Sequence, residues 1–155
     1  MRYLFFVLIL FVFTQCEKFP MDRRYSLYLK NNADYPIVYF TAININPLPS
    51  VYPDTTLRSD SLLMEAKIQS GENMDLWARD VRIKDLFDDL PGDTLSIYLF
   101  HIDTLKNNTW ADVQAGYKIL KRYDLSLEDL EHLDYKLNYP PDAKMSGVKM
   151  YPPYP

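Results

Sequence analysis

A nine-residue segment, Thr94–Ile102, places the strongest constraint on how this chain can fold. Leu95 and Ile97 fall on one face of an extended segment, and Tyr98 and Phe100 fall on the other. A strand that is apolar on both faces needs protein on both sides to cover it. We therefore expect Thr94–Ile102 to be a central strand that lies between two layers.

Other short segments alternate polar and apolar residues and end at turn-forming residues, as strands do. They are Tyr25–Lys30, Ile37–Ile43, Leu62–Ile68, Met74–Trp77, Tyr117–Tyr123, Tyr135–Tyr139 and Val148–Tyr151. The first two are expected to pair as an antiparallel hairpin. Leu62–Ile68 also fits a helix, but the turn at Gly71 after it favours a strand.

Three polar residues are placed to begin short helices. Asp80 precedes apolar residues that recur at i, i+3, i+4 and i+7 from Ile83, and Thr109 and Ser126 precede similar short stretches. Ser126 is followed three residues later by Asp129, which can take part in a capping box. The fold expected is mainly β: a small antiparallel β-sandwich of about seven short strands with two or three short helical connections. An α+β fold is the alternative.

Cys16 is the only cysteine, and it follows a basic start and a short apolar run. The run is shorter than the roughly 20 apolar residues that a membrane-spanning helix needs, and it suits a secretory signal. We expect residues 1–15 to be a signal peptide, residues 16–24 to be a lipidated cysteine and tether, and residues 25–155 to form one β-rich domain. An ordinary signal peptide with a chance cysteine, or an uncleaved anchor, are the alternatives.

The charge of the chain limits its partners. Acidic residues outnumber basic ones by 21 to 17, and the net charge of −4 argues against nucleic acid as the main partner. The two histidines, His101 and His132, have no partner at the spacing of metal ligands, and four glycines are too few for phosphate-binding loops. We expect no catalytic residue, no metal ion and no cofactor.

Several stretches together suggest a relationship to known proteins. Phe13–Cys16 resembles a lipobox, and the resemblance continues through Tyr52–Leu57, Asp93–Tyr98, Ile119–Leu130 and Tyr139–Pro141. These stretches resemble a group of small, uncharacterised lipoproteins of Bacteroidetes-type bacteria. The resemblance implies a cell-envelope lipoprotein with palmitate or similar chains on Cys16, most simply in the outer membrane, and it carries over no catalytic residues.

A three-residue pattern occurs four times: Asp, then Ser or Thr, then an aliphatic residue or Thr. The hydroxyl residues of the four copies are Thr55, Ser61, Thr94 and Thr104. The pattern resembles the O-glycosylation signal that such bacteria use on exported proteins. Turn chemistry explains it equally well, because Asp-Thr at a strand entry caps backbone groups.

The aromatic residues leave open how such a protein acts. Trp77, Trp110 and the tyrosines could form a stacking platform for a polysaccharide, although filling the core of a small glycine-poor domain is the more usual role. The function expected is that of a lipid-anchored envelope protein that acts without catalysis, as a binding or structural accessory module for another envelope component, which is a protein or a polysaccharide. Carbohydrate binding through exposed aromatics is the alternative, and a small hydrolase that uses scattered carboxylates is a third.

Overall fold

The structure is a computed structural model, and it describes residues 26–41, 52–57, 67–77, 82–88 and 90–155. Within these ranges the chain is mainly β, with eight strands in two open sheets. The strands are β1 (Tyr28–Asn31), β2 (Ile37–Thr41), β3 (Lys67–Ile68), β4 (Asn73–Asp75), β5 (Leu95–His101), β6 (Lys121–Leu125), β7 (Lys136–Tyr139) and β8 (Lys149–Tyr151).

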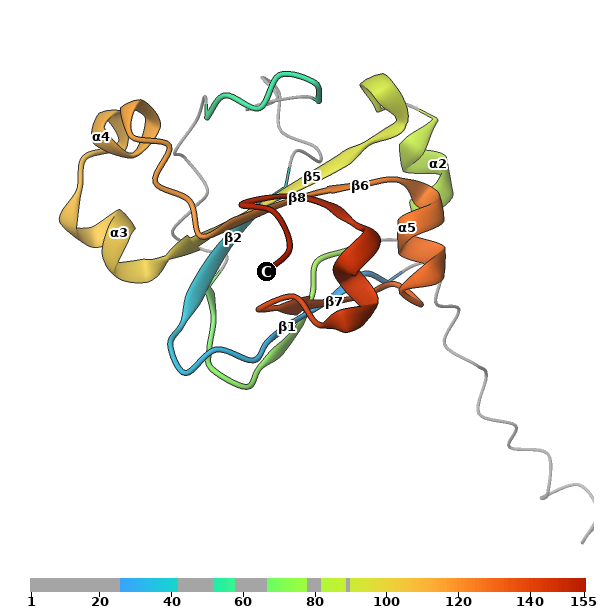
Figure 1. Ribbon diagram of the computed structural model, residues 1–155, viewed down its shortest axis with the longest axis horizontal. Coiled ribbons are helices and arrows are strands. Elements are labelled where there is room, and N and C mark those ends of the chain that lie inside the picture. Colours follow the sequence, from blue (N-terminus) through green and yellow to red (C-terminus); the bar gives the residue numbers. More distant parts are fainter. Residues whose placement is uncertain (1–25, 42–51, 58–66, 78–81, 89) are drawn as a thin grey trace, which may run out of the picture.

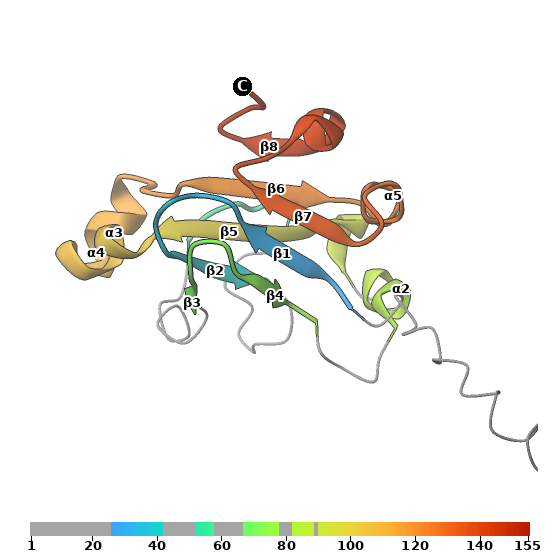
Figure 2. The same cartoon turned by 90° about the horizontal axis from the view of Figure 1, so that it is seen from below.

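Short helices connect the strands. The α-helices are α2 (Ile83–Phe87), α3 (Ile102–Asn107), α4 (Trp110–Ala115) and α5 (Leu127–His132), and the two 3₁₀ turns are Pro91–Asp93 and Ala143–Gly147. Helices α3 and α4 lie at one end of the sheets, and α2 and α5 lie at the other (Figure 1; Figure 2). In the described part of the chain, no helix has the length and hydropathy needed to cross a membrane.

The larger sheet has the order β3-β2-β5-β6-β8, and the smaller has the order β4-β1-β7. Strand β5 is central in the larger sheet, as expected, and pairs antiparallel with β2 and β6. Its residues Leu95 and Ile97 face the main core, which fills the space between the two sheets. Its residues Tyr98 and Phe100 face a second, smaller core on the opposite side of the sheet. The β-sandwich expected from the sequence is therefore confirmed.

The expected hairpin between the first two strands is wrong. Strand β1 pairs with β4 and, in parallel, with β7, whereas β2 lies in the other sheet. Asn31, at the end of β1, is completely buried, and its Nδ2 donates to the carbonyl oxygens of Tyr35, Ile68 and Gln69 at 2.8–3.2 Å. Its Oδ1 accepts from the Ala33 amide at 3.0 Å. This side chain satisfies the backbone at the corner where the chain changes sheets, so no tight turn forms there.

The expected caps of two helices are confirmed. Thr109 begins α4 and Ser126 begins α5, and each forms a capping box with the Asp three residues later. Asp80, which was expected to cap a third helix, lies outside the described residues. Helix α2 follows Arg82, whose side chain makes no capping hydrogen bond.

Candidate functional site

Several residues singled out from the sequence lie outside the described ranges or in separate places. Cys16 and Ser61 are outside the described residues. Thr94 is half-buried, and its hydroxyl donates to the carbonyl of Gly92 at 2.7 Å. Thr104 lies within α3 and not at the entry of a strand. Glycosylation of these residues stays a prediction.

Trp77 and Trp110 do not form a common surface. Trp77 is only 4% exposed and belongs to the main core. Trp110 is half-buried, packs against the second core, and has its ring 6.0 Å from that of Phe100. The large sheet separates the two cores, so a stacking platform that joins these tryptophans does not exist in this fold.

The histidines also have local roles. His101 ends β5, and its Nδ1 accepts from the Asp103 amide at 3.1 Å, which caps α3. Its ring also packs against Tyr35 at 4.6 Å. His132 is exposed at the end of α5. Among the described residues, no group of three or more His, Cys, Asp or Glu side chains is arranged to hold a metal ion.

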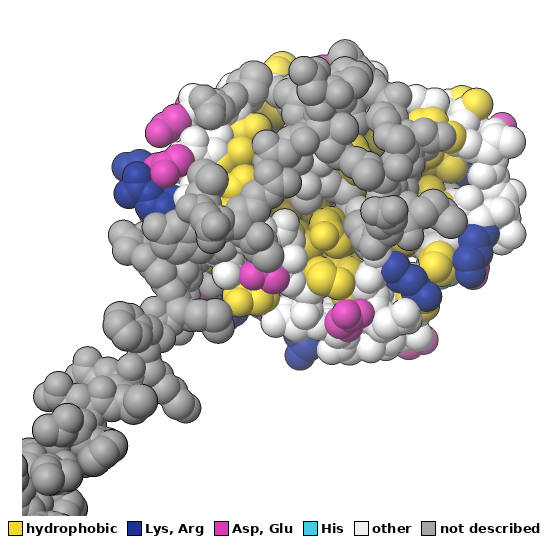
Figure 3. All heavy atoms as spheres, turned by 180° about the vertical axis from the view of Figure 1, so that it is seen from behind, with side chains coloured by type: hydrophobic (Ala, Val, Ile, Leu, Met, Phe, Trp, Pro, Cys, Tyr) yellow, Lys and Arg dark blue, Asp and Glu magenta, His cyan; other side chains and the backbone are white. Residues whose placement is uncertain are grey.

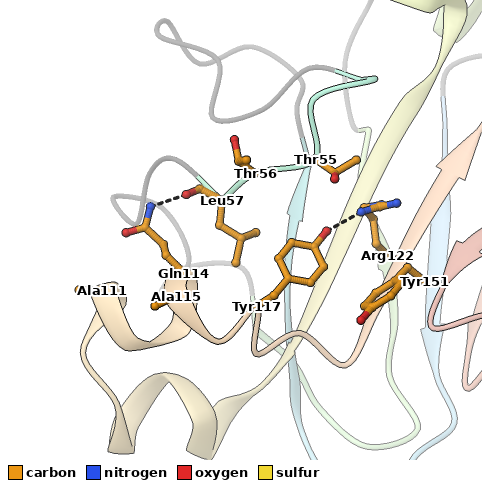
Figure 4. Close-up of a pocket in the computed structure, with 9 residues that line it drawn as sticks. All are labelled: Thr55, Thr56, Leu57, Ala111, Gln114, Ala115, Tyr117, Arg122 and Tyr151. Carbon is orange, nitrogen blue, oxygen red and sulfur yellow. Dashed lines mark hydrogen bonds between the residues drawn. The ribbon is translucent and has the colours of Figure 1, made fainter.

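A groove of about 880 Å³ opens on the face of the large sheet that carries the second core. Figure 4 shows its walls: the segment of residues 55–57 on one side, α4 on another, and the strands β6 and β8 beneath. The lining residues share a mixed polar and aromatic character; they are Thr55, Thr56, Leu57, Ala111, Gln114, Ala115, Tyr117, Arg122 and Tyr151. We consider this groove the candidate functional site.

The register of three strands builds the floor of the groove. Arg122 of β6 is paired across the sheet with Tyr98 on one side and Tyr151 on the other. Asp124, two residues further along β6, is paired with Ser96 and lies on the same face of the strand as Arg122. The floor is therefore formed by Arg122, with Asp124 beside it on the same face of β6.

Asp124 is a hydrogen-bonded ion-pair partner of Arg122. The Arg122 Nε donates to both Asp124 oxygens at 3.0 and 3.1 Å, and Nη2 donates to Oδ2 at 3.0 Å. The Ser96 hydroxyl donates to Asp124 Oδ1 at 2.8 Å. The Asp124 side chain is 1% exposed and that of Arg122 is 12% exposed, so the pair is largely removed from water. Burial acts against the charge of Arg122, but its hydrogen bonds to Asp124 and Tyr117 outweigh burial and raise its pKa above the ordinary value.

Two tyrosines enclose the guanidinium. The Arg122 Nη1 donates to the Tyr117 hydroxyl, as Figure 4 shows. The Tyr151 ring lies 5.8 Å from the Arg122 guanidinium carbon and meets the Tyr117 ring edge-on, with centroids 5.5 Å apart. Cation–π contacts of this kind fix the orientation of a cation without consuming its hydrogen-bond donors.

Local structure explains why Tyr117 reaches the floor. The sequence predicts a strand from Tyr117, but the strand begins only at Lys121. After α4, the backbone of Tyr117 adopts a positive φ of 46°, and the amides of Tyr117 and Lys118 bond back to the carbonyls of Gln114 and Val113. This turn points the Tyr117 ring toward Arg122 instead of continuing the strand.

Two further side-chain contacts join neighbouring segments of the chain around the groove. The Gln114 side chain of α4 donates to the Leu57 carbonyl, which ties the helix to the opposite wall. The Lys149 ammonium donates to the Tyr52 hydroxyl and lies 4.8 Å from the centre of its ring. The hydrogen bond to Tyr52 raises the pKa of Lys149 above its ordinary value. The groove is thus bounded by side chains from four separate parts of the chain.

The groove offers hydrogen-bond donors and aromatic faces. Of the described residues that line it, none is Asp, Glu, His or Cys, the residue types that most often serve as acid, base or metal ligand. Sequence reasoning named the tyrosines only as a class of possible stacking residues and did not single out Arg122. The available signal was the alternation in β6, where Arg122 and Asp124 occupy one strand face, and Lys121, Tyr123 and Leu125 occupy the other.

Comparisons of the chain with models of protein families, with curated proteins and with solved structures find no significant match.

Proposed function

We propose that this protein is a lipid-anchored component of the cell envelope, in the outer membrane, that acts by binding and not by catalysis. Lipid on Cys16 holds it to the membrane, residues 16–24 serve as a tether, and the groove above Arg122 is the binding surface. The partner is an envelope protein or a polysaccharide.

One observation carries the binding role: the groove holds a cation, Arg122, that is supported by a buried carboxylate, a tyrosine hydroxyl and an aromatic ring. Arg122 is fixed by Asp124 from one side and by Tyr117 from another before any ligand arrives. Such preorganisation lowers the entropy that binding would otherwise cost. The lining supplies no pair of carboxylates across the groove, which a glycosidase would use.

Among the described residues, the groove is where an exposed large aromatic side chain lies. Figure 3 shows the face opposite to that of Figure 1, where described side chains of both charges are scattered among hydrophobic ones. Tyr151, at the groove, is the one large hydrophobic residue among the described residues that is counted as exposed, at 47%. Tyrosine and arginine are among the residue types that most often contribute binding energy at interfaces.

Site-specific photo-crosslinking in living cells tests the binding role. A crosslinking residue replaces Ala111, the exposed second residue of α4 in the groove wall, and the control replaces Glu128, the exposed second residue of α5 at the other end of the sheets. We expect an adduct from position 111 and none from position 128. Protease or periodate treatment of the adduct then distinguishes a protein from a polysaccharide. No adduct from either position, or equal adducts from both, would contradict the proposal.

The anchor has a separate test. Cells are fed an alkyne analogue of palmitate, and membranes are separated from soluble fractions. We expect label on the protein and its recovery with outer membranes, and we expect both to be lost in Cys16→Ala. A protein that stays unlabelled, or a variant that stays in the membrane, would refute anchoring through Cys16.

A further inference from the structure

We propose that the groove binds a saccharide that carries a carboxylate, such as a chain of uronic acid units. This inference rests on the binding function proposed for the same groove and names its ligand. Arg122 would receive the carboxylate, and Tyr151 would stack against the sugar ring.

The donor count of Arg122 supports an anionic ligand. A guanidinium has five N–H groups. Asp124 takes the Nε hydrogen and one on Nη2, and Tyr117 takes one on Nη1. Within the described part of the chain, the remaining hydrogen on each terminal nitrogen has no partner. One N–H group thus remains on each terminal nitrogen, and the two oxygens of a carboxylate can accept from them.

The charged side chains near Arg122 also favour an anionic ligand. Asp124 is buried beneath the guanidinium, and both of its oxygens are occupied by Arg122 and Ser96, so it does not face a ligand in the groove. Lys149, paired across β6 and β8 with Asp124, adds a positive charge at the edge of the same strands. A ligand in the groove therefore meets one cation, Arg122, together with neutral hydrogen-bonding side chains and no acidic lining residue among those described, in a protein whose net charge is −4.

The exposed ring of Tyr151 supports a sugar. The ring contacts Arg122 and Tyr117, yet 47% of the residue is exposed. An amphipathic ring with one open side, next to hydrogen-bond donors, can cover the C–H face of a pyranose while the donors bind its oxygens. Thr55 adds a hydroxyl at the same end of the groove, as Figure 4 shows.

The other end of the groove argues against a peptide. Peptide-binding grooves use deep apolar pockets in which an anchor side chain is buried. Here the apolar end consists of Leu57, which is itself buried, and the methyl groups of Ala111 and Ala115. These residues form a shallow wall and not a pocket, so the groove favours a flat, polar chain.

Calorimetric titration of the intact protein in detergent tests the inference. The probes are trimers of galacturonic, glucuronic and mannuronic acid, each with its methyl ester as a matched neutral control, and the peptide Ala-Ala-Leu with a free or an amidated carboxyl terminus. We expect at least one acidic trimer to bind, with its ester roughly tenfold weaker or worse, since hydrogen bonds between charged groups are lost.

Two variants locate the binding. Tyr151→Ala removes an exposed ring and should keep the fold, and Arg122→Lys keeps the charge but loses the planar fork. Each should weaken the acidic trimer about tenfold or more, whereas the controls Tyr28→Ala and Arg82→Lys, both outside the groove, should not change it. Circular dichroism checks that each variant is folded. If Arg122→Lys unfolds, Tyr151→Ala and the comparison of acid with ester still test whether the groove binds an acidic saccharide.

The outcomes separate this inference from the function on which it rests. Binding to none of the three trimers, equal binding of acid and ester, or binding of the peptide alone would overturn the acidic saccharide. A crosslink from position 111 in cells would in that case still support a binding groove. If neither the crosslink nor any probe is found, both proposals fail.

Discussion

Replacing Asp124 by Asn should destabilise this protein far more than the same change at the surface. Arg122 directs its Nε and Nη2 at the two carboxylate oxygens over 3.0–3.1 Å, and the Asp124 side chain is 1% exposed. Breaking a buried ion pair from one side costs about 3–5 kcal/mol because the other charge is left uncompensated. Arg122 keeps slight exposure and its bond to Tyr117, so we expect a loss of about 2–4 kcal/mol for Asp124→Asn.

Urea unfolding at pH 7, followed by the fluorescence of the buried Trp77, measures this loss. The control is Asp85→Asn, since Asp85 pairs with Arg82 at 2.9 Å but both side chains are 40–50% exposed. That change should cost less than about 1 kcal/mol. For a domain of this size, each kcal/mol of loss lowers Tm by roughly 3–5 °C, so Asp124→Asn should lower Tm by roughly 6–20 °C.

A double-mutant cycle shows whether the loss comes from the pair itself. Arg122→Leu and Asp124→Asn together remove both charges, so the double variant should lose about 2 kcal/mol less than the sum of the single losses. Additive losses, or an Asp124→Asn loss no larger than that of Asp85→Asn, would refute the reasoning that the floor of the groove is a buried ion pair.

Three further outcomes are expected. Asn31→Ala removes four hydrogen bonds at a buried corner and should lower the free energy of unfolding by about 2–4 kcal/mol in urea; a loss below about 1 kcal/mol would show that the corner holds without it. Thr109→Ala and Ser126→Ala each remove a capping box and should cost about 1 kcal/mol in thermal unfolding, additively in the double variant. Burial raises the pKa of the Tyr123 and Tyr139 phenols above the ordinary value of 10.0, so the unfolded chain releases their protons first. The contribution of each tyrosine to stability is therefore complete below pH 10 and falls by about 1.4 kcal/mol per pH unit above it, a slope that Tyr139→Phe should reduce in unfolding experiments between pH 9 and 11.

Local signals in the sequence predicted the elements whose causes are local. The alternation in Thr94–Ile102 requires burial on both faces, and β5 is the central strand between two cores. Thr109 and Ser126 cap their helices because the bond partner of each lies three residues away. Such features depend on neighbouring residues, so reading the chain in order is enough to find them.

The pairing of strands and the site have causes that are distant in the sequence. Asn31 bonds to carbonyl oxygens about 37 residues further along the chain, at the corner where the chain passes from the sheet of β1 to that of β2. Arg122 and Tyr151 come together only because β6 and β8 pair in one register. Trp77 and Trp110 look alike in the sequence, yet one enters the main core and the other packs on the second.

The amino-acid sequence by itself was enough to predict the short strands, two helix caps and a β-sandwich. It also predicts a lipid anchor at Cys16. Those properties follow from periodicity, capping chemistry and position in the chain. Only the tertiary structure decided that Arg122 is a buried, paired cation at the floor of a groove and that Tyr151, rather than Trp77, offers an exposed ring. The physical reason is that exposure and charge pairing depend on which strands become neighbours, and this is settled when long-range hydrogen bonds and apolar packing form together.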